Sequence, residues 1–423
     1  MTFLIVIMLG LFALSVPIAF ALGVAALPFF LERRLPLIAI PQVIFDSMDS
    51  FVLLAVPLYV LAGRLMMTGG VARRLVEFAV SLVGFLRGGL AAATVLTSML
   101  FATISGSSAA TAAAIGSTLI PEMERKKYPR PFAAAVVASS GELGVIIPPS
   151  VPMVIYAVIT GVSITDLFIA GIMPGIMIGL SLILTIVAVS TIRNYGEREP
   201  FQLKPYVANI VVATRRAALS LVMPFIILGG IYGGVFTPTE AAVVAVAYAL
   251  FLGCIVYREI PLKALPRIFA ESAFTSSIVM IIVGFAFVFA YALALMQAPQ
   301  QVAAAIRGVS SDPMVFLLLV NLFLFVVGMF METFAAIIIL APVLAPVAQA
   351  LGIDPVHFGL IMIVNLAIGM VTPPVGVNLF VACGIANITM EQLMRPLLVF
   401  LAVLIINMFI ITYVPWLSLA LIR

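Results

Sequence analysis

The chain has 423 residues, of which 64% are hydrophobic and only 9% are charged. Soluble globular proteins carry about 25% charged residues, so this composition excludes that class and indicates an integral membrane protein. The net charge of +4 is small and sits in short loops, where it indicates topology rather than a nucleic-acid partner. Because the apolar blocks do not alternate as barrel strands do, we expect a polytopic all-α membrane protein with about nine or ten spans.

The first apolar block, at residues 1–30, reads MTFLIVIMLGLFALSVPIAFALGVAALPFF. It lacks the basic leader of a signal peptide, and its apolar run is longer than such a peptide needs. We therefore predict that this block forms the first span.

The next informative segment, at residues 88–124, is apolar but carries the polar stretch SGSSAAT at its middle. Arg87 precedes it and ERKKYPR follows it, and these basic flanks mark both ends as cytoplasmic. A segment that enters and leaves on one face is a re-entrant helical hairpin. Its non-helical tip is tolerated at membrane depth only when it is buried in protein or lines a cavity.

Two breaks with the same design follow, GVIIPPS at residues 144–150 and GMVTPPV at residues 369–375. Other landmarks recur in the same order at nearly the same spacing: Gly106 and Thr111 with Gly328 and Thr333, Ile164 and Thr165 with Ile388 and Thr389, Pro174 with Pro396, and Pro17 with Pro238. This recurrence predicts two homologous halves, residues 1–195 and 217–423.

A second hairpin is predicted at residues 312–349, with the tip GMFMET. The segment after it, ALGIDPVHFG, contains no Lys or Arg, so this hairpin is expected to enter from the opposite face. The two halves would then form inverted-topology repeats, each with a re-entrant hairpin and a helix broken by a Pro pair.

The Pro pairs point to a binding site. Proline removes an amide donor and clashes with the carbonyl one turn back, so a Pro pair opens a helix. Unpaired backbone groups are expensive inside a membrane and need a partner. Freed carbonyls and hydroxyls suit a hard cation such as Na⁺, and the N-termini of half-helices suit an anion. The alternative is that the prolines merely kink two helices.

Each hairpin tip and the break beside it therefore predict one sodium site, giving two or more bound Na⁺ and no transition metal. The predicted sodium ligands are Ser105, Gly106, Ser108, Gly144, Ile147 and Pro148 in the first half, and Gly328, Thr333, Gly369, Thr372 and Val375 in the second. The predicted contacts to an anionic substrate are Ser107, Thr111, Ser150, Glu332 and Asn378. For each small residue the alternative is helix packing.

Three further acids have different expectations. Glu240 follows TPT, a helix-start signal, and is predicted to cap that helix; Asp166 after GVSIT is predicted to be a structural acid at a helix start. Glu142, just before the first break, either orients the unwound loop or handles a proton, and the sequence leaves both open.

His357, in the stretch GIDPVHFG, is predicted to be a solvated loop residue. Cys254 and Cys383 lie in apolar segments far apart and are expected to pack without forming a disulfide. An enzyme would need an acid, base or metal cluster, and the polar residues offer only isolated carboxylates. No phosphate-binding loop of the form G-x-x-x-x-G-K-[ST] occurs, so any ATP hydrolysis must come from another chain.

Four stretches, SGSSAATAAAIGSTLIPEM, SSGELGVIIPPSVPMVIYA, GGVFTPTEAAVVAV and GMVTPPVGVNLFVACGIA, resemble the large membrane subunit of tripartite ATP-independent periplasmic (TRAP) transporters. The resemblance covers nearly the whole chain. It implies an elevator-type carrier in the bacterial inner membrane, driven by a sodium gradient. It also implies two partners, a small four-helix membrane subunit and a periplasmic substrate-binding protein, besides the organic-anion substrate and membrane lipid.

In this reading, residues 1–87 and 217–311 form scaffold helices with an arm, residues 88–192 and 312–423 form the transport parts, and residues 193–216 form the linker. Three classes of function stay open: a TRAP subunit for an organic carboxylate, a stand-alone sodium/dicarboxylate symporter, and an ATP-driven permease or membrane-embedded enzyme. The first is preferred. Members of that family carry dicarboxylates, sialic acids and sugar acids, and the sequence does not select among them.

Overall fold

The computed structural model describes residues 2–196, 203–301, 304 and 312–423. All regular secondary structure in these residues is helical, as the composition predicts. By length and composition, seven of the described helical segments can cross a membrane, or eight if the bent pair α4 (Ala55–Thr68) and α5 (Val71–Val83) forms one span. This is fewer than the nine or ten predicted spans, because several other apolar helices are only 10–17 residues long.

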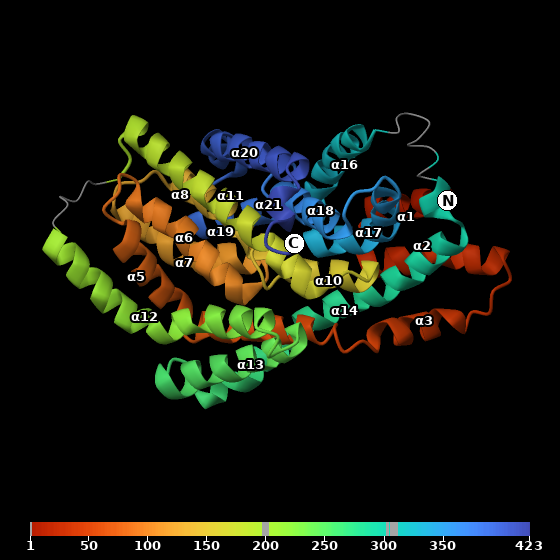
Figure 1. Cartoon of the computed structure of the whole chain (residues 1–423), viewed down its shortest axis with the longest axis horizontal. Coiled ribbons are helices and arrows are strands. Elements are labelled where there is room, and N and C mark those ends of the chain that lie inside the picture. The colour runs from red at the N-terminus through yellow and green to blue at the C-terminus, as the bar shows by residue number, and fades with distance from the viewer. Residues whose placement is uncertain (1, 197–202, 302–303, 305–311) are drawn as a thin grey trace.

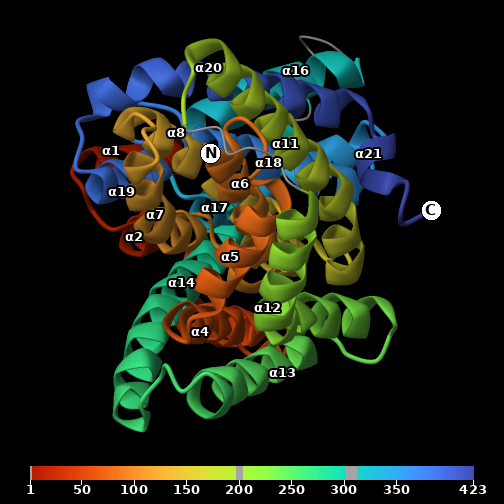
Figure 2. The same ribbon diagram turned by 90° about the vertical axis from the view of Figure 1, so that its left-hand side faces the viewer.

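One group of helices holds the two hairpins and the two broken helices, and we call it the hairpin body. It occupies the upper part of Figures 1 and 2. Its members are α6 (Gly89–Ser105), α7 (Ser108–Arg125), α8 (Arg130–Gly141), α9 (Leu143–Ile146), α10 (Val151–Thr160), α11 (Ile164–Arg193), α16 (Pro313–Gly328), α17 (Thr333–Ala350), α18 (Pro355–Gly369), α19 (Val377–Ala386), α20 (Met390–Tyr413) and α21 (Trp416–Leu419).

The remaining helices, apart from α5, form what we call the scaffold group. Its members are α1 (Thr2–Ala13), α2 (Ile18–Glu32), α3 (Ala39–Met48), α4, α12 (Leu203–Tyr232), α13 (Pro238–Leu250), the π-helical turn η1 (Phe251–Val256), the 3₁₀ turn η2 (Leu262–Ala264) and α14 (Leu265–Leu295). In Figure 2, α4, α13 and α14 lie in the lower half of the view, and α12 descends toward them.

Equivalent helices of the two halves make equivalent contacts. In the scaffold group α2 packs against α14, and its counterpart α13 packs against α4. In the hairpin body α7 packs against α19, and its counterpart α17 packs against α10. The second arm of each hairpin therefore rests on the half-helix that follows the break of the other half, and the two halves are interlocked at the centre.

Two segments differ from the sequence prediction. The first apolar block is not one span, because Pro17 lacks an amide hydrogen and Ser15 has a positive φ of 59°, so the chain breaks between α1 and α2. The predicted linker 193–216 is also largely helical, since α12 begins at Leu203 and packs against α5. Residues 197–202 of that linker lie outside the described residues.

The helix-start predictions are confirmed. Thr237 and Glu240 form a reciprocal capping box, in which the Thr237 amide donates to Glu240 Oε2 at 2.8 Å and the Glu240 amide donates to Thr237 Oγ1 at 3.3 Å. Asp166 lies in the first turn of α11, where its amide donates to Ser163 Oγ at 3.2 Å. Cys254 and Cys383 are both free thiols, as expected.

The prediction for His357 is wrong. Asp354 and Pro355 start α18, and His357 lies in its first turn with only 2% of its surface exposed. The ring Nδ1 lies 3.0 Å from Ser418 Oγ, and Nε2 lies 3.2 Å from the carbonyl oxygen of Thr412. The segment that carries Ser418 covers the histidine, which local sequence does not reveal.

Candidate functional site

The first break meets the tip of the first hairpin. Helix α9 ends at Ile146, the chain becomes extended at Ile147, and the Pro148–Pro149 peptide bond is cis. Gly106, with a positive φ of 60°, ends α6 at the hairpin tip, and its carbonyl accepts the amide of Val151 at 3.3 Å. The tip is thus bound to the start of α10, directly after the break in its own half.

Gly144 makes this approach possible. A Cβ at this position would lie only 2.5 Å from the carbonyl oxygen of Ser107 and from Thr111 Oγ1. The same two hairpin groups join a hydroxyl cluster, in which Thr111 Oγ1 lies 2.7 Å from Ser105 Oγ and donates to the Ser107 carbonyl at 2.8 Å. Two hydroxyls and a carbonyl thus gather beside the opened backbone, and these oxygen ligands fit a hard cation.

The second break repeats the arrangement. Helix α18 ends at Gly369, the Pro373–Pro374 bond is cis, and the Gly376 amide donates to the Met329 carbonyl at the second tip, at 3.2 Å. Gly328 and Gly369 allow the close approach, because a Cβ on Gly328 would lie 3.0 Å from the Cα of Gly369.

Hydroxyl groups are fewer around the second break. Thr372 Oγ1 donates to the Ile368 carbonyl at 2.9 Å, and Thr333 Oγ1 donates to the sulfur of Met370 at 3.0 Å. Sulfur is a weak hydrogen-bond acceptor, so the Thr333 hydroxyl would sacrifice little interaction energy if it reoriented to bind a cation.

One polar contact joins the two halves at the centre. Asn378, near the start of α19, donates from Nδ2 to Ser108 Oγ of the first hairpin at 2.5 Å. Its Oδ1 is buried and has no hydrogen-bond partner among the described residues. Both carboxylate oxygens of Glu142 are likewise buried and unpartnered there. Buried polar atoms without partners are rare, and such atoms are candidates to contact a ligand, water or ion.

The structure brings most of the predicted ligands together and turns three of them elsewhere. The predicted ligands that meet at the first break are Ser105, Gly106, Ser107, Thr111 and Gly144, with Ile147 and Pro148 next to them along the chain. The predicted ligands that lie at the second break are Gly328, Thr333, Gly369, Thr372 and Val375. Ser108 faces Asn378, whereas the Ser150 hydroxyl donates to the Val145 carbonyl at 2.6 Å inside the break. Glu332 is the N-cap residue of α17, where its side chain makes no capping hydrogen bond.

Sequence reasoning missed a pair of equivalent contacts between each hairpin and its broken helix. Ser98 Oγ donates to Ser140 Oγ at 3.1 Å in the first half. At the corresponding positions of the second half, Asn365 Nδ2 donates to Asn321 Oδ1 at 2.8 Å. The signal was present, because these polar residues interrupt apolar helices at the repeat spacing.

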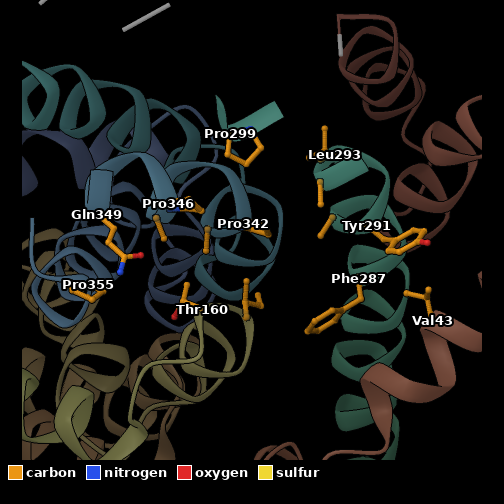
Figure 3. Close-up of a pocket in the computed structure, with 15 residues that line it drawn as sticks. Val43, Thr160, Phe287, Tyr291, Leu293, Pro299, Pro342, Pro346, Gln349 and Pro355 are labelled. Carbon is orange, nitrogen blue, oxygen red and sulfur yellow. The ribbon is translucent and has the colours of Figure 1, made fainter. Parts of the chain in front are cut away.

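Two cavities lie between the hairpin body and the rest of the molecule. The first, of about 390 Å³, separates α14 and α3 from α17, and Figure 3 shows Phe287 and Tyr291 on one wall with Pro342 and Pro346 on the other. The second, of about 670 Å³, lies between α5, α12 and the first hairpin, with Lys126 and Arg216 among its charged lining residues. Neither cavity includes the breaks themselves.

Comparison with known proteins supplies the context. The family described as "Tripartite ATP-independent periplasmic transporter, DctM component" matches residues 5–417. A C4-dicarboxylate TRAP transporter large permease of Pseudomonas aeruginosa is 45% identical over 378 residues, which are 89% of this chain and 88% of that protein. A sialic acid TRAP transporter large permease of Vibrio cholerae is 39% identical, covering 98% and 96% of the two chains.

A third relative is longer than this chain. The isethionate TRAP transporter permease of Oleidesulfovibrio alaskensis is 45% identical over 97% of this chain, which spans only 65% of that protein. Among solved structures, the YdaH transporter of Alcanivorax borkumensis superposes with a TM-score of 0.62 at 16% identity, covering 88% of this chain and 86% of that one. At that identity the likeness concerns the fold alone.

Proposed function

The chain belongs to the DctM family, the large permeases of TRAP transporters in the inner membrane, and we propose that it performs sodium-coupled uptake of an organic anion. The finer parts of this proposal are the coupling ion, the substrate class, the partners and the motion.

One observation carries the sodium proposal. In each half the hairpin tip accepts a backbone hydrogen bond from the residue just after its own Pro–Pro break, Val151 to Gly106 and Gly376 to Met329. Carbonyl and hydroxyl oxygens therefore gather at two equivalent places. A cation with ligands from both the tip and the break would hold the hairpin against the broken helix. Ion binding would in this way be coupled to binding at the substrate site.

The substrate is proposed to bind between these two places. Half-helices α10 and α19 both begin there, and the positive ends of their dipoles favour an anion. Of the predicted substrate contacts, Ser107, Thr111 and Asn378 supply the nearby polar groups, whereas the Ser150 hydroxyl is engaged by the Val145 carbonyl. Named substrates of the relatives include C4-dicarboxylates, sialic acid and isethionate, all of which are organic acids. We therefore propose an organic acid that presents one anionic group to the helix ends.

The motion is proposed to be of the elevator type. Both cavities lie along the border of the hairpin body, which would be the moving part. The scaffold group would stay in the lipid and bind a small membrane subunit, while a periplasmic binding protein would deliver the substrate. These partners are proposed from family membership.

The test is uptake into proteoliposomes that contain this chain with its small membrane subunit, using a binding protein loaded with a labelled organic acid. We expect uptake only with an inward Na⁺ gradient, with a Hill coefficient for Na⁺ above one. Equal uptake in K⁺ or choline, driven by a proton gradient alone, would contradict the proposal. Full activity without the binding protein would favour the stand-alone symporter.

A further inference from the structure

Helices α4 and α5 follow each other across a short break and are bent relative to one another by 69°. The bend occurs at Gly69 and Gly70, and Gly70 has a φ of 73°, which residues with a side chain rarely adopt. Helix α4 packs mainly against α13 and α14 of the scaffold group and to a lesser extent against α6 and α10, whereas α5 packs equally against α6 of the hairpin body and α12. The bend therefore connects the two groups.

A carboxylate from a distant part of the sequence lies directly on this bend. Glu259, in the loop between η1 and η2, contacts Gly70 so closely that a Cβ there would lie 2.5 Å from Glu259 Oε1. The same oxygen accepts hydrogen bonds from Arg73 Nη2 at 2.7 Å and Arg74 Nη1 at 2.8 Å. Glu259 thus places negative charge at the N-terminus of α5, where Gly70 provides no side-chain cap.

Arg74 is held from a second side. Its guanidinium carbon lies 3.5 Å from the centre of the Tyr257 ring, and its Nη1 also donates to the Gly70 carbonyl at 2.9 Å. The Tyr257 hydroxyl lies 3.0 Å from Ser220 Oγ on α12. Only 17% of the Arg74 side chain and 27% of the Glu259 side chain are exposed, so solvent screens this pair less than a surface ion pair. We call Arg73, Arg74, Tyr257 and Glu259 the α5 clasp.

We propose that Glu259 is a positioning residue for transport, which sets the angle of α5 and thereby the position of the first hairpin relative to the scaffold group. The inference rests on the proposed function for its kinetic consequence, but its structural part is independent of it. Glycine pairs at element ends absorb hinge motion, and an ionic contact across such a pair can hold one angle and release it without unfolding either helix.

The scaffold group supplies a matched control. Glu271 also accepts from two arginines, Arg267 Nε at 2.7 Å and Arg64 Nη1. This pairing joins α4 to α14 within the scaffold group and does not cross the bend. Glu271→Gln therefore removes a comparable charge without touching the hinge.

The experiment uses spin labels at Ser81 on α5 and Ala247 on α13, in the complex with its small subunit and with Cys254 and Cys383 replaced by serine. Glu259→Gln should broaden the distance distribution and lower the maximal uptake rate roughly five-fold, with the half-saturating Na⁺ concentration unchanged. Glu271→Gln should leave the distances as they are. Arg73→Gln removes the more exposed half of the clasp and should give a smaller broadening, which keeps the test open if Glu259→Gln folds poorly.

Unchanged distances in both clasp variants would overturn the proposal, as would equal broadening in Glu271→Gln. A shifted Na⁺ half-saturation in Glu259→Gln would also overturn it, because the clasp would then act on ion binding. If wild-type uptake proves independent of Na⁺, the proposed function fails while the distance measurement still decides the role of Glu259.

Discussion

The two Pro–Pro breaks share a backbone design but lie in different surroundings. In the first, every residue from Gly144 to Ser150 is buried. In the second, Pro374 is exposed and its neighbours Pro373 and Val375 are half-buried. The tip-to-break hydrogen bond is nevertheless the same in both halves. The two breaks thus have the same backbone geometry although their packing differs. Ion coordination by backbone carbonyls would require this shared geometry.

The side chains at the two tips differ as well. The Ser105 and Thr111 hydroxyls and the Ser107 carbonyl form a closed cluster at the first tip, whereas Thr333 at the second tip reaches only the sulfur of Met370. We infer that the first site is preformed and that the second is completed when its ligand binds. Changes at the first should therefore lower both stability and ion affinity, and changes at the second should lower chiefly affinity.

The largest effect is expected where the two halves are alike. Gly144→Ala and Gly369→Ala would each place a methyl group against hairpin atoms, and overpacking of this kind costs about 1–3 kcal/mol. Both should reduce Na⁺-driven uptake roughly 5- to 150-fold. Gly384→Ala on α19 is the control, because no atom lies within 4 Å of its new Cβ. Normal uptake by either variant would show that its break is not closely packed on the hairpin.

Sequence predicted the hairpins, the breaks and the caps because their signals are local. A Pro pair, a Gly or a cluster of hydroxyls inside an apolar block has few structural explanations, and Glu240 after TPT is a helix start in any fold. The repeat spacing then located the hairpin and the break of the second half from those of the first.

What sequence could not give is the direction of individual side chains. Ser108 turns to Asn378 of the other half because α7 packs on α19, a crosswise contact that no local pattern encodes. The start of α12 looked like a linker because it ends the polar stretch RNYGEREPFQLKPY at residues 193–206, although the helix packs on α5. His357 was misjudged although Asp354 and Pro355 form a helix-start signal just before it.

The next largest effect is expected in chemical labelling, which compares the solvent accessibility of the two breaks. Ser150 and Val375 occupy equivalent repeat positions, but Ser150 is fully buried and Val375 is half-buried. In a background lacking Cys254 and Cys383, Val375→Cys should react with a membrane-impermeant maleimide many times faster than Ser150→Cys. Saturating Na⁺ should slow the reaction at Val375→Cys by completing the second site. Equal reaction rates would mean that the first break opens to water and that the contrast is not a property of the working protein.

A smaller difference is expected between the two tip threonines. Thr111→Val removes two hydrogen bonds of a closed cluster, so it should lower Tm and raise the half-saturating Na⁺ concentration about ten-fold. Thr333→Val removes only a contact to sulfur, and should raise that concentration roughly three-fold while Tm stays the same. Thermal unfolding and Na⁺ titration of uptake measure the two quantities. If both variants lose the same stability, the second site is as preformed as the first.

The smallest effect is expected at the hydrogen bonds that join each hairpin to its broken helix, because there the two halves differ only in the strength of the contact. Ser98→Ala removes the hydrogen bond to Ser140, whose hydroxyl keeps the Val137 carbonyl as acceptor, so stability should fall by only about 1 kcal/mol. Asn321→Ala should lower Tm further, because Asn321 also exchanges hydrogen bonds with Thr412 that no other group replaces. Both contacts lie outside the oxygen clusters, so neither variant should shift the Na⁺ half-saturation. A shift in Ser98→Ala alone would show that the first site depends on how α6 is fastened to α8, and the first break would then be held by its supporting helices more than by its own tip.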